Sequence, residues 1–306
     1  MRVTVLAGGV GGSRFTRGLI EVLGEANVTV IGNVGDDLEV LGLHVSPDLD
    51  TLLYTLAGLA DDDRGWGRAG ETWNALATAE ALGEQTWFRL GDRDIGLHLV
   101  RTAALRSGEP LSSVTARLAR AVGLELALLP ATDDRLRTWI ETPAGSFEFQ
   151  DWFVRRGHRD RADAVRYEGA DRAEPAPGVL EALRRADLVL IAPSNPFVSI
   201  GPILAVAKIH AALREREVPC VAVSPLIGGR AVKGPADAMF ASLAGGTSAA
   251  HVARCYEGLI DALVIDEADS GAELPVRPIV TRTLMDDEEA RRRVAEAALE
   301  VAGAPR

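Results

Sequence analysis

The chain has 306 residues, enough for one large α/β domain or two ordinary ones, and its 47% hydrophobic and 25% charged content is that of a globular protein. Its net charge of −11 argues against nucleic acid as the main partner, because binding a phosphate backbone requires a basic surface. Cys220 and Cys255 supply neither a disulfide framework nor a cysteine-based metal site, and no segment has the roughly 20 apolar residues that span a bilayer. We therefore expect a cytoplasmic protein with no membrane partner.

The N-terminal part has the pattern of a parallel sheet. A short apolar strand is predicted at residues 3–7, followed by a glycine-rich turn, a helix at about 13–23 and a second strand at 28–31. Short continuous apolar runs of this kind are typical of strands that are buried on both faces.

The middle of the chain has a different sequence pattern. Residues 51–122 are predicted to be mainly helical, and a hairpin is predicted with strands at 137–141 and 146–149. The stretch 160–177 is polar, charged and short of large apolar residues, so we expect a mobile loop there.

The strand pattern returns late in the chain, with strands predicted at 187–192, 219–223 and 262–265 and helices at about 203–216 and 286–301. The predicted fold is a single α/β domain with a Rossmann-like parallel sheet and helices on both faces, built from 1–50 and 180–306. A mainly helical insertion at about 51–179 is expected to cap a cleft beyond the C-terminal ends of the strands, where such sheets bind ligands.

The turn after the first strand holds four glycines in five residues: Gly8, Gly9, Gly11 and Gly12. It is no Walker A loop, because no Gly-Lys-Ser/Thr follows, and Arg14 stands where the dinucleotide fingerprint requires a third glycine. The four glycines either serve the geometry of a tight turn or cradle a phosphate or diphosphate with backbone amides at a helix N-terminus. More glycines are present than a turn needs, which favours the phosphate cradle.

Four acids follow the next two segments: Asp36, Asp37, Asp48 and Asp50. On an extended segment Asp48 and Asp50 would point the same way; alternatively, Asp50 caps a helix that starts at Thr51. Carboxylates beside a phosphate cradle repel the phosphate unless a divalent cation lies between them, so these acids indicate a metal site with oxygen ligands.

Two further segments carry polar groups at predicted strand ends. Arg89 precedes a Gly-Asp turn and is a candidate ligand for an anion or a carbonyl group. Ser194 and Asn195 follow a buried strand within Pro193-Ser-Asn-Pro196, where they either cap the next helix or contact a phosphate or a base edge.

A family resemblance is carried by seven motifs that occur in this order: LAGGVGGSRFTRGL, NVGDD, SPDLDTLLYTLAG, GWG, ETW, TWFRLGDRD and APSNPFVSIGPIL. Together they resemble the 2-phospho-L-lactate transferase family of coenzyme F(420) biosynthesis, whose actinobacterial members are phosphoenolpyruvate transferases. The resemblance covers nearly the whole chain. The basic residues are overwhelmingly arginine, with only Lys208 and Lys233 as lysines, which agrees with an actinobacterial protein and with an enolpyruvyl donor.

The resemblance implies that the acceptor is the deazaflavin Fo and that the donor is a guanosine diphosphate carrying an enolpyruvyl or lactyl group. The terminal ribityl hydroxyl of Fo attacks the substituted phosphate and GMP leaves, with Mg²⁺ required. The family's deazaflavin-binding and catalytic residues fall on Asp50 and Arg89, and the nucleotide side of the cleft falls on the glycine turn with Ser194 and Asn195. The resemblance also implies a homodimer.

The residues leave several points open. Mg²⁺ is expected on Asp50 with Asp36, Asp37 or Asp48. Asp50 is either a metal ligand or the base for the attacking hydroxyl, and it is also a candidate to orient that hydroxyl. A sugar-phosphate nucleotidyltransferase, suggested by Leu6-Ala-Gly-Gly with Arg14, and a non-catalytic nucleotide sensor are the alternative functions; the first normally has a lysine further along, which this chain lacks.

Overall fold

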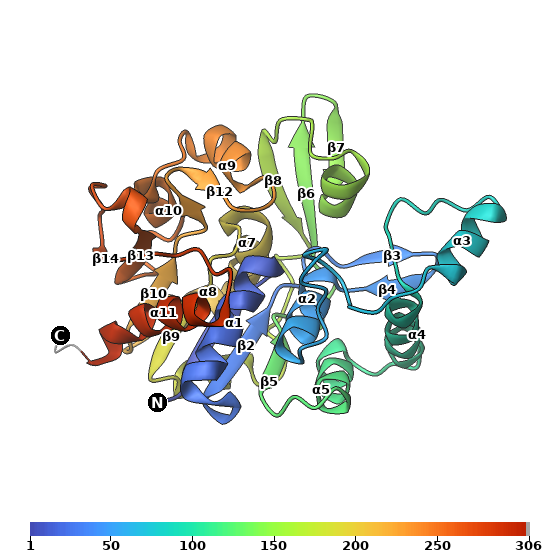
Figure 1. The fold of residues 1–306 in the computed structure, drawn as a ribbon, viewed down its shortest axis with the longest axis horizontal. Helices are drawn as coiled ribbons and strands as arrows, with labels where there is room; N and C mark the ends of the chain where they lie inside the picture. Colours follow the sequence, from blue (N-terminus) through green and yellow to red (C-terminus); the bar gives the residue numbers. More distant parts are fainter. Residues whose placement is uncertain (304–306) are drawn as a thin grey trace.

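A seven-stranded parallel sheet forms the centre of the computed structural model, which describes residues 1–303 (Figure 1). Its strand order is β14-β13-β10-β9-β1-β2-β5. The strands are β1 (Val3–Ala7), β2 (Val28–Gly32), β5 (Ala127–Pro130), β9 (Leu188–Ile191), β10 (Cys220–Val223), β13 (Ala262–Asp266) and β14 (Arg277–Thr281). The predicted α/β fold with a Rossmann-like sheet is confirmed.

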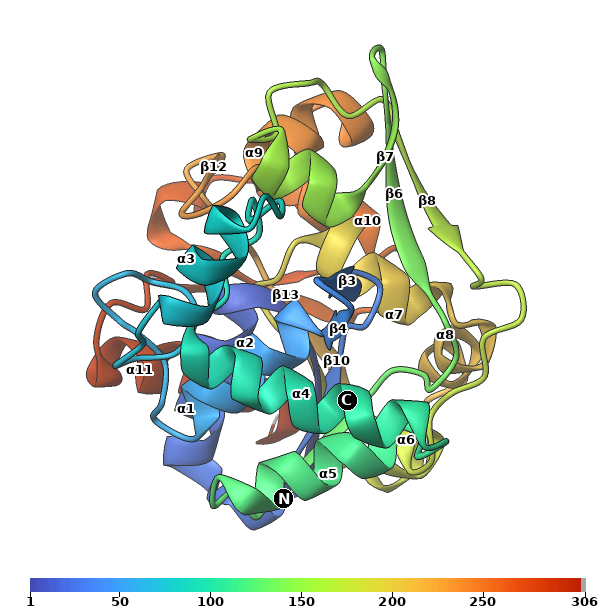
Figure 2. The ribbon, with the colours of Figure 1, turned by 90° about the vertical axis from the view of Figure 1, so that its right-hand side faces the viewer.

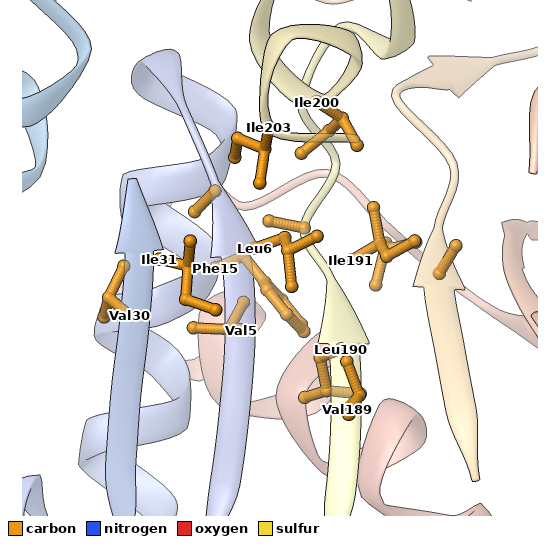
Figure 3. Close-up of a cluster of buried hydrophobic side chains, with 14 of the residues drawn as sticks. Val5, Leu6, Phe15, Val30, Ile31, Val189, Leu190, Ile191, Ile200 and Ile203 are labelled. Carbon is orange, nitrogen blue, oxygen red and sulfur yellow. The ribbon is translucent and has the colours of Figure 1, made fainter. Parts of the chain in front are cut away.

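The apolar runs of the sequence form the middle of this sheet. Val5 of β1 lies between Val30 of β2 and Leu190 of β9, and all three side chains are fully buried (Figure 3). Because helices cover both faces, these strands carry apolar side chains on both sides rather than alternating between apolar and polar.

Helices pack on both faces of the sheet. The helices α1 (Gly9–Leu23), α2 (Pro47–Leu56) and α11 (Glu288–Leu299) pack together on one face. The helices α6 (Val179–Arg185) and α8 (Ala207–Arg214) pack together on the other face (Figure 2). The shorter helices α7 (Gly201–Ala205), α9 (Ala236–Met239) and α10 (Ala249–Cys255) belong to the connections after β9 and β10.

The expected insertion at 51–179 lies only partly outside the sheet. It contains α3 (Asn74–Ala81), α4 (Asp92–Arg106) and α5 (Leu111–Ala121), but β5 within it pairs with β2 and forms an edge of the central sheet. The prediction missed β5 because its four residues follow directly on a helical stretch and give too short an apolar run to recognise.

A second, antiparallel sheet stands beyond the end of the central sheet (Figure 1). Its strands are β6 (Arg137–Thr142), β7 (Gly145–Glu148) and β8 (Ala164–Glu168). The predicted hairpin corresponds to β6 and β7. The prediction of a loop over 160–177 is wrong for β8, where Val165 and Tyr167 pair with Ile140 and Thr138 of β6. Charged residues alternate with these apolar ones, so the segment appears polar although it is a strand.

A short hairpin of β3 (Leu38–Val40) and β4 (Leu43–Val45) separates the first pair of acids from the second. Another hairpin, β11 (Leu226–Ile227) with β12 (Arg230–Ala231), follows β10. Asp48 and Asp50 do not lie on an extended segment, because α2 begins at Pro47 with Ser46 at its N-cap position. Both acids are in the first turn of α2, where residues two apart point to different sides.

No single helix within residues 1–303 is long and apolar enough to cross a membrane; only a pair bent by 91°, Pro196–Ala205 with Ala207–Arg214, reaches that length and composition.

Candidate functional site

A cavity of about 820 Å³ lies at the C-terminal ends of the strands. The chain leaves β1 through α1 toward β2 and leaves β9 toward β10 on the opposite side, so the strand order reverses between β1 and β9. Residues that follow five strands line the cavity: Gly8 after β1, Asp36 after β2, Ser194 after β9, Ser224 after β10 and Thr283 after β14. This is the switch-point position at which open α/β sheets bind ligands, and we call it the switch-point cavity.

Three of the four glycines, Gly8, Gly9 and Gly11, line the cavity at the N-terminus of α1. Packing requires glycine at two of them. A Cβ on Gly8 would overlap the Asp48 carboxylate, and a Cβ on Gly11 would lie 2.6 Å from the carbonyl oxygen of Pro193. Gly12 does not line the cavity; its Cβ would lie 2.5 Å from Ser194 Oγ. The loop thus combines close packing with a helix N-terminus that faces the cavity and favours negative charge.

Ser194 and Asn195 join this loop to the end of β9. The Ser194 hydroxyl donates to the carbonyl oxygen of Gly8 (2.7 Å) and accepts from its amide (3.1 Å). Asn195 Oδ1 accepts from the amide of Phe197 (2.9 Å) and so begins the helical turn Pro196–Ile200. Both residues line the cavity, but their hydrogen bonds to the protein show that they also have structural roles.

Asp36 and Asp48 are brought together by Asn33, which the sequence prediction missed. Asn33 Nδ2 donates to Asp36 Oδ1 (3.3 Å) and to Asp48 Oδ2 (2.9 Å), while Gln150 Nε2 donates to Asp36 Oδ2 (3.0 Å). Asp36 and Asp48 are buried and line the cavity.

Burial makes this pair of carboxylates unfavourable when both are ionised. Burial raises the pKa of Asp48 to about 6, although hydrogen bonds from Asn33 and the Gly9 backbone lower it. Burial and then the charge of Asp48 raise the pKa of Asp36 well above its usual range. Two clustered oxygen donors with raised pKa values fit a divalent cation, because its charge offsets their repulsion.

The other two acids face different partners, so the four carboxylates do not converge. Asp37 accepts from Ser46 Oγ (3.0 Å), lies 2.9 Å from His44 Nε2 and does not line the cavity. In the part of the chain that the structure describes, no three His, Cys, Asp or Glu side chains form a group that could hold a metal ion. The expected Mg²⁺ site on Asp50 with Asp36, Asp37 or Asp48 stays a prediction, and Asp36 with Asp48 is the pair of acids that shares a hydrogen-bond donor.

Asp50 lines the cavity but is paired with Arg101 of α4. Arg101 Nη1 donates to Asp50 Oδ2 (3.0 Å) and Nη2 donates to Oδ1, so one guanidinium engages both oxygens. Burial alone would raise the pKa of Asp50, but the Arg101 charge outweighs it and the pKa is lowered. Asp50 is therefore an ionised hydrogen-bond acceptor with its charge already balanced, and the alternative that it caps α2 is wrong because Ser46 holds that position.

More polar groups surround this ion pair. Tyr54 donates to Asp94 Oδ1 (2.6 Å), and both line the cavity. Burial raises the pKa of Asp94 to about 6 and lowers that of His98 to about 4, so His98 is neutral near pH 7. None of these residues stood out in the sequence, although Asp94, His98 and Arg101 follow helical spacing on α4.

Arg89 also lines the cavity, from an exposed position. Its guanidinium lies 4.8 Å from the ring centroid of Trp73, and the guanidinium of Arg64 lies 5.1 Å from the same ring. The stack continues to Trp66, whose ring centroid is 5.0 Å from Arg64. These cation–π contacts hold two arginines at the rim. Arg14 and Lys233 add two more cations to the lining.

Comparison with known proteins decides the family. A sequence model of 2-phospho-L-lactate transferase CofD matches residues 3–296. The chain belongs to the CofD family. A phosphoenolpyruvate transferase of Streptomyces griseus is 45% identical, with 99% of this chain and 98% of the relative covered. A protein of the same name from Thermobifida fusca is 44% identical, with 99% of this chain and 98% of the relative covered. Another from Mycolicibacterium smegmatis is 40% identical, with 99% of both chains covered.

A solved structure shares the overall fold. A member of the UPF0052 family from Bacillus halodurans has a TM-score of 0.64 with 16% sequence identity, over 97% of this chain and 99% of that one. At this identity the likeness supports the fold alone. The roles expected for Asp50 and Arg89 stay predictions, and the structure shows that both reach the same cavity.

Proposed function

We propose that the protein transfers a phosphoenolpyruvyl group from a guanosine-diphosphate-linked donor to the terminal ribityl hydroxyl of the deazaflavin Fo, releasing GMP. The enolpyruvyl donor is favoured over a 2-phospho-L-lactyl donor because the relatives at 40–45% identity are named phosphoenolpyruvate transferases. The observation that carries the proposal is the switch-point cavity, whose lining contains the glycine turn, an acid pair, Asp50 and Arg89.

The glycine side of the cavity suits the donor. Gly9 and Gly11 at the N-terminus of α1, together with Arg14, offer amides, a helix dipole and a cation to a diphosphate. Phosphoryl transfer depends mainly on positioning and charge neutralisation, so this chain needs no covalent nucleophile of its own.

Asp36 and Asp48 are the residues that would hold Mg²⁺. Two protein carboxylates, with the remaining positions left to phosphate oxygens and water, are the usual protein share of a magnesium site at a nucleotide. When bound, the ion would supply positive charge that stabilises the attacked phosphate and the departing GMP. Asn33 and Gln150 hold the two carboxylates in place through the hydrogen bonds described above.

Asp50 and Arg89 suit the acceptor. Asp50 Oδ1 keeps one lone pair for an incoming hydroxyl or ring N–H, and the lowered pKa of Asp50 makes it an orienting acceptor rather than a general base. Arg89 can donate to carbonyl oxygens of a flat heterocycle, and the aromatic side chains of Trp66, Trp87 and Phe88 offer apolar faces in the same lining.

The test is incubation of the purified protein with Fo, the donor and Mg²⁺, with mass detection of the phosphodiester and of GMP. We expect both products in equal amounts. Absence of the phosphodiester with a competent donor would contradict the proposal. Comparing enolpyruvyl and lactyl donors at equal concentration measures the preference between them.

A further inference from the structure

Buried polar side chains form a seam between α2 and α4, which we call the α2–α4 seam. It consists of Asp50 and Tyr54 of α2 with Asp94, His98 and Arg101 of α4. Asp50 and Tyr54 are one turn apart, and the three residues of α4 follow at intervals of four and three, so each helix presents one polar face to the other. Each of the five residues is at most 7% exposed. Burying so many polar groups is costly, and the seam borders the switch-point cavity.

Arg101 differs from the other members of the seam because it does not line the cavity. Its side chain is 2% exposed and engages both oxygens of Asp50, while the Ser46 amide donates to Asp50 Oδ2 at 3.3 Å. Three N–H groups from two directions therefore fix the carboxylate plane. Oδ2 accepts two of these bonds, whereas Oδ1 accepts only one and still has a lone-pair direction left for a ligand in the cavity.

A planar guanidinium is needed for this arrangement. It presents two parallel N–H donors to the two carboxylate oxygens, whereas a lysine ammonium would keep the charge but act as a point donor. His98 cannot replace it, because its Nδ1 lies 3.8 Å from Asp50 Oδ2 and burial keeps the ring neutral.

We propose that Arg101 is a positioning residue for the acceptor: it holds the Asp50 carboxylate in the one orientation that receives the acceptor, without touching the acceptor itself. The proposal rests on the proposed function, since it deepens the role of Asp50 on the acceptor side. It assigns α4, a helix of the expected insertion, a direct part in building the site.

Two variants test the proposal: Arg101→Lys, which keeps the charge, and Arg101→Gln, which keeps a planar donor. Arg216→Lys is the matched control, because Arg216 is also mostly buried and ion-paired, to Asp261 at 2.7 Å, but does not line the cavity. Steady-state KM values for acceptor and donor and the acceptor Kd by calorimetry are measured on variants that circular dichroism shows to be folded.

We expect both Arg101 variants to raise the acceptor KM and Kd by about 10- to 100-fold, the range for a charged hydrogen bond that is lost. The donor KM should stay within about twofold of the wild type, as should all constants of Arg216→Lys, because neither change touches the donor side. A merely structural role of Arg101 would move donor and acceptor constants together.

Asp50→Asn in combination with either Arg101 variant shows whether Arg101 acts through Asp50. Once Asp50 is changed, the Arg101 substitution should add less than about twofold to the acceptor Kd. The proposal would be overturned if the folded Arg101 variants bound the acceptor normally, or if donor and acceptor constants changed equally. It would also be overturned if the fold-changes in acceptor Kd caused by the Arg101 substitution and by Asp50→Asn multiplied in full in the double variant. Absence of product with the wild-type protein would instead overturn the proposed function.

Discussion

Asp36, Asp48 and Asp50 are close in the sequence and equally buried, yet their neighbours give them different chemistry. Asp36 and Asp48 share Asn33 and have raised pKa values, so they are poised to accept a cation. Asp50 has Arg101 and a lowered pKa, so its charge is already balanced. The neighbouring side chain therefore matters more than burial in setting the direction of the pKa shift of each carboxyl group.

The Asp36→Asn variant tests the metal pair. Removing one of two carboxylates should raise the Mg²⁺ concentration for half-maximal activity at least about tenfold, whereas the metal-free protein should become more stable, because a repulsive buried acid is gone. Activity is measured against Mg²⁺ concentration and stability by thermal melting in EDTA. Asp63→Asn, at an exposed position, is the control. A variant with normal magnesium dependence would exclude Asp36 as a ligand.

The Asp94→Asn variant tests the pH dependence of stability. The pKa of Asp94 is about 6 in the folded protein, above its ordinary value of 3.8, so the folded state binds a proton more tightly than the unfolded state. Its contribution to stability is complete below about pH 4 and is lost as the pH rises through 6. The asparagine variant does not have this loss. The difference in unfolding free energy between the variant and the wild type should therefore shift in favour of the variant by about 2 kcal/mol from pH 4.5 to pH 7.5. Denaturant unfolding at both pH values measures the difference; a gap that does not widen with pH would contradict the shift.

Two loops, one after β1 and one after β9, are joined into a single wall of the cavity. The hydroxyl of Ser194 bonds both backbone groups of Gly8, and Gly11 packs against Pro193. The four glycines are thus explained partly by close packing and partly by the helix N-terminus that they expose. The two joined loops together, rather than any single residue, expose the N-terminus of α1 to a phosphate group.

The Gly8→Ala variant tests this packing. The new Cβ would overlap the Asp48 carboxylate and lie 2.9 Å from Ser199 Cβ, so we expect a loss of about 1–3 kcal/mol in unfolding free energy. The displaced Asp48 should also weaken magnesium-dependent activity. Gly96→Ala is the matched control: Gly96 lies within α4 with no atom within 4 Å of an added Cβ, and the change should leave stability equal or slightly raised. Equal stability of the two variants would show that the loops after β1 and β9 shift to accommodate the added methyl group.

The whole molecule assembles the cavity from distant parts of the chain. Its lining takes residues from the loops that follow the central strands, from the expected insertion and from the connection after β10, among them Asp36, Arg89, Gln150, Ser194 and Lys233. A ligand that bridges these parts should stabilise the fold as a unit. The expected homodimer stays a prediction that light scattering tests against the chain mass of 32.5 kDa.

Ligand-dependent melting tests this coupling. The donor with Mg²⁺ at about 100 times its Kd should raise the melting temperature by about 5 °C, because binding to the folded state alone adds about 2.7 kcal/mol. Addition of EDTA should remove most of the rise, since the diphosphate then meets the acid pair without its cation. A rise that survives EDTA would mean that the donor binds away from Asp36 and Asp48.

The sequence predicts five of the seven strands of the central sheet, because the apolar runs at β1, β2, β9, β10 and β13 are local patterns that burial on both faces imposes. It also located the glycine turn and, through the order of its motifs, the family. The partners of the acids, by contrast, depend on contacts between distant parts of the chain. Arg101 reaches Asp50, and Gln150 reaches Asp36, across long stretches of chain. The direction in which Asp48 and Asp50 point depends on where α2 begins, and pairing energies depend on distance in space, which no local pattern records.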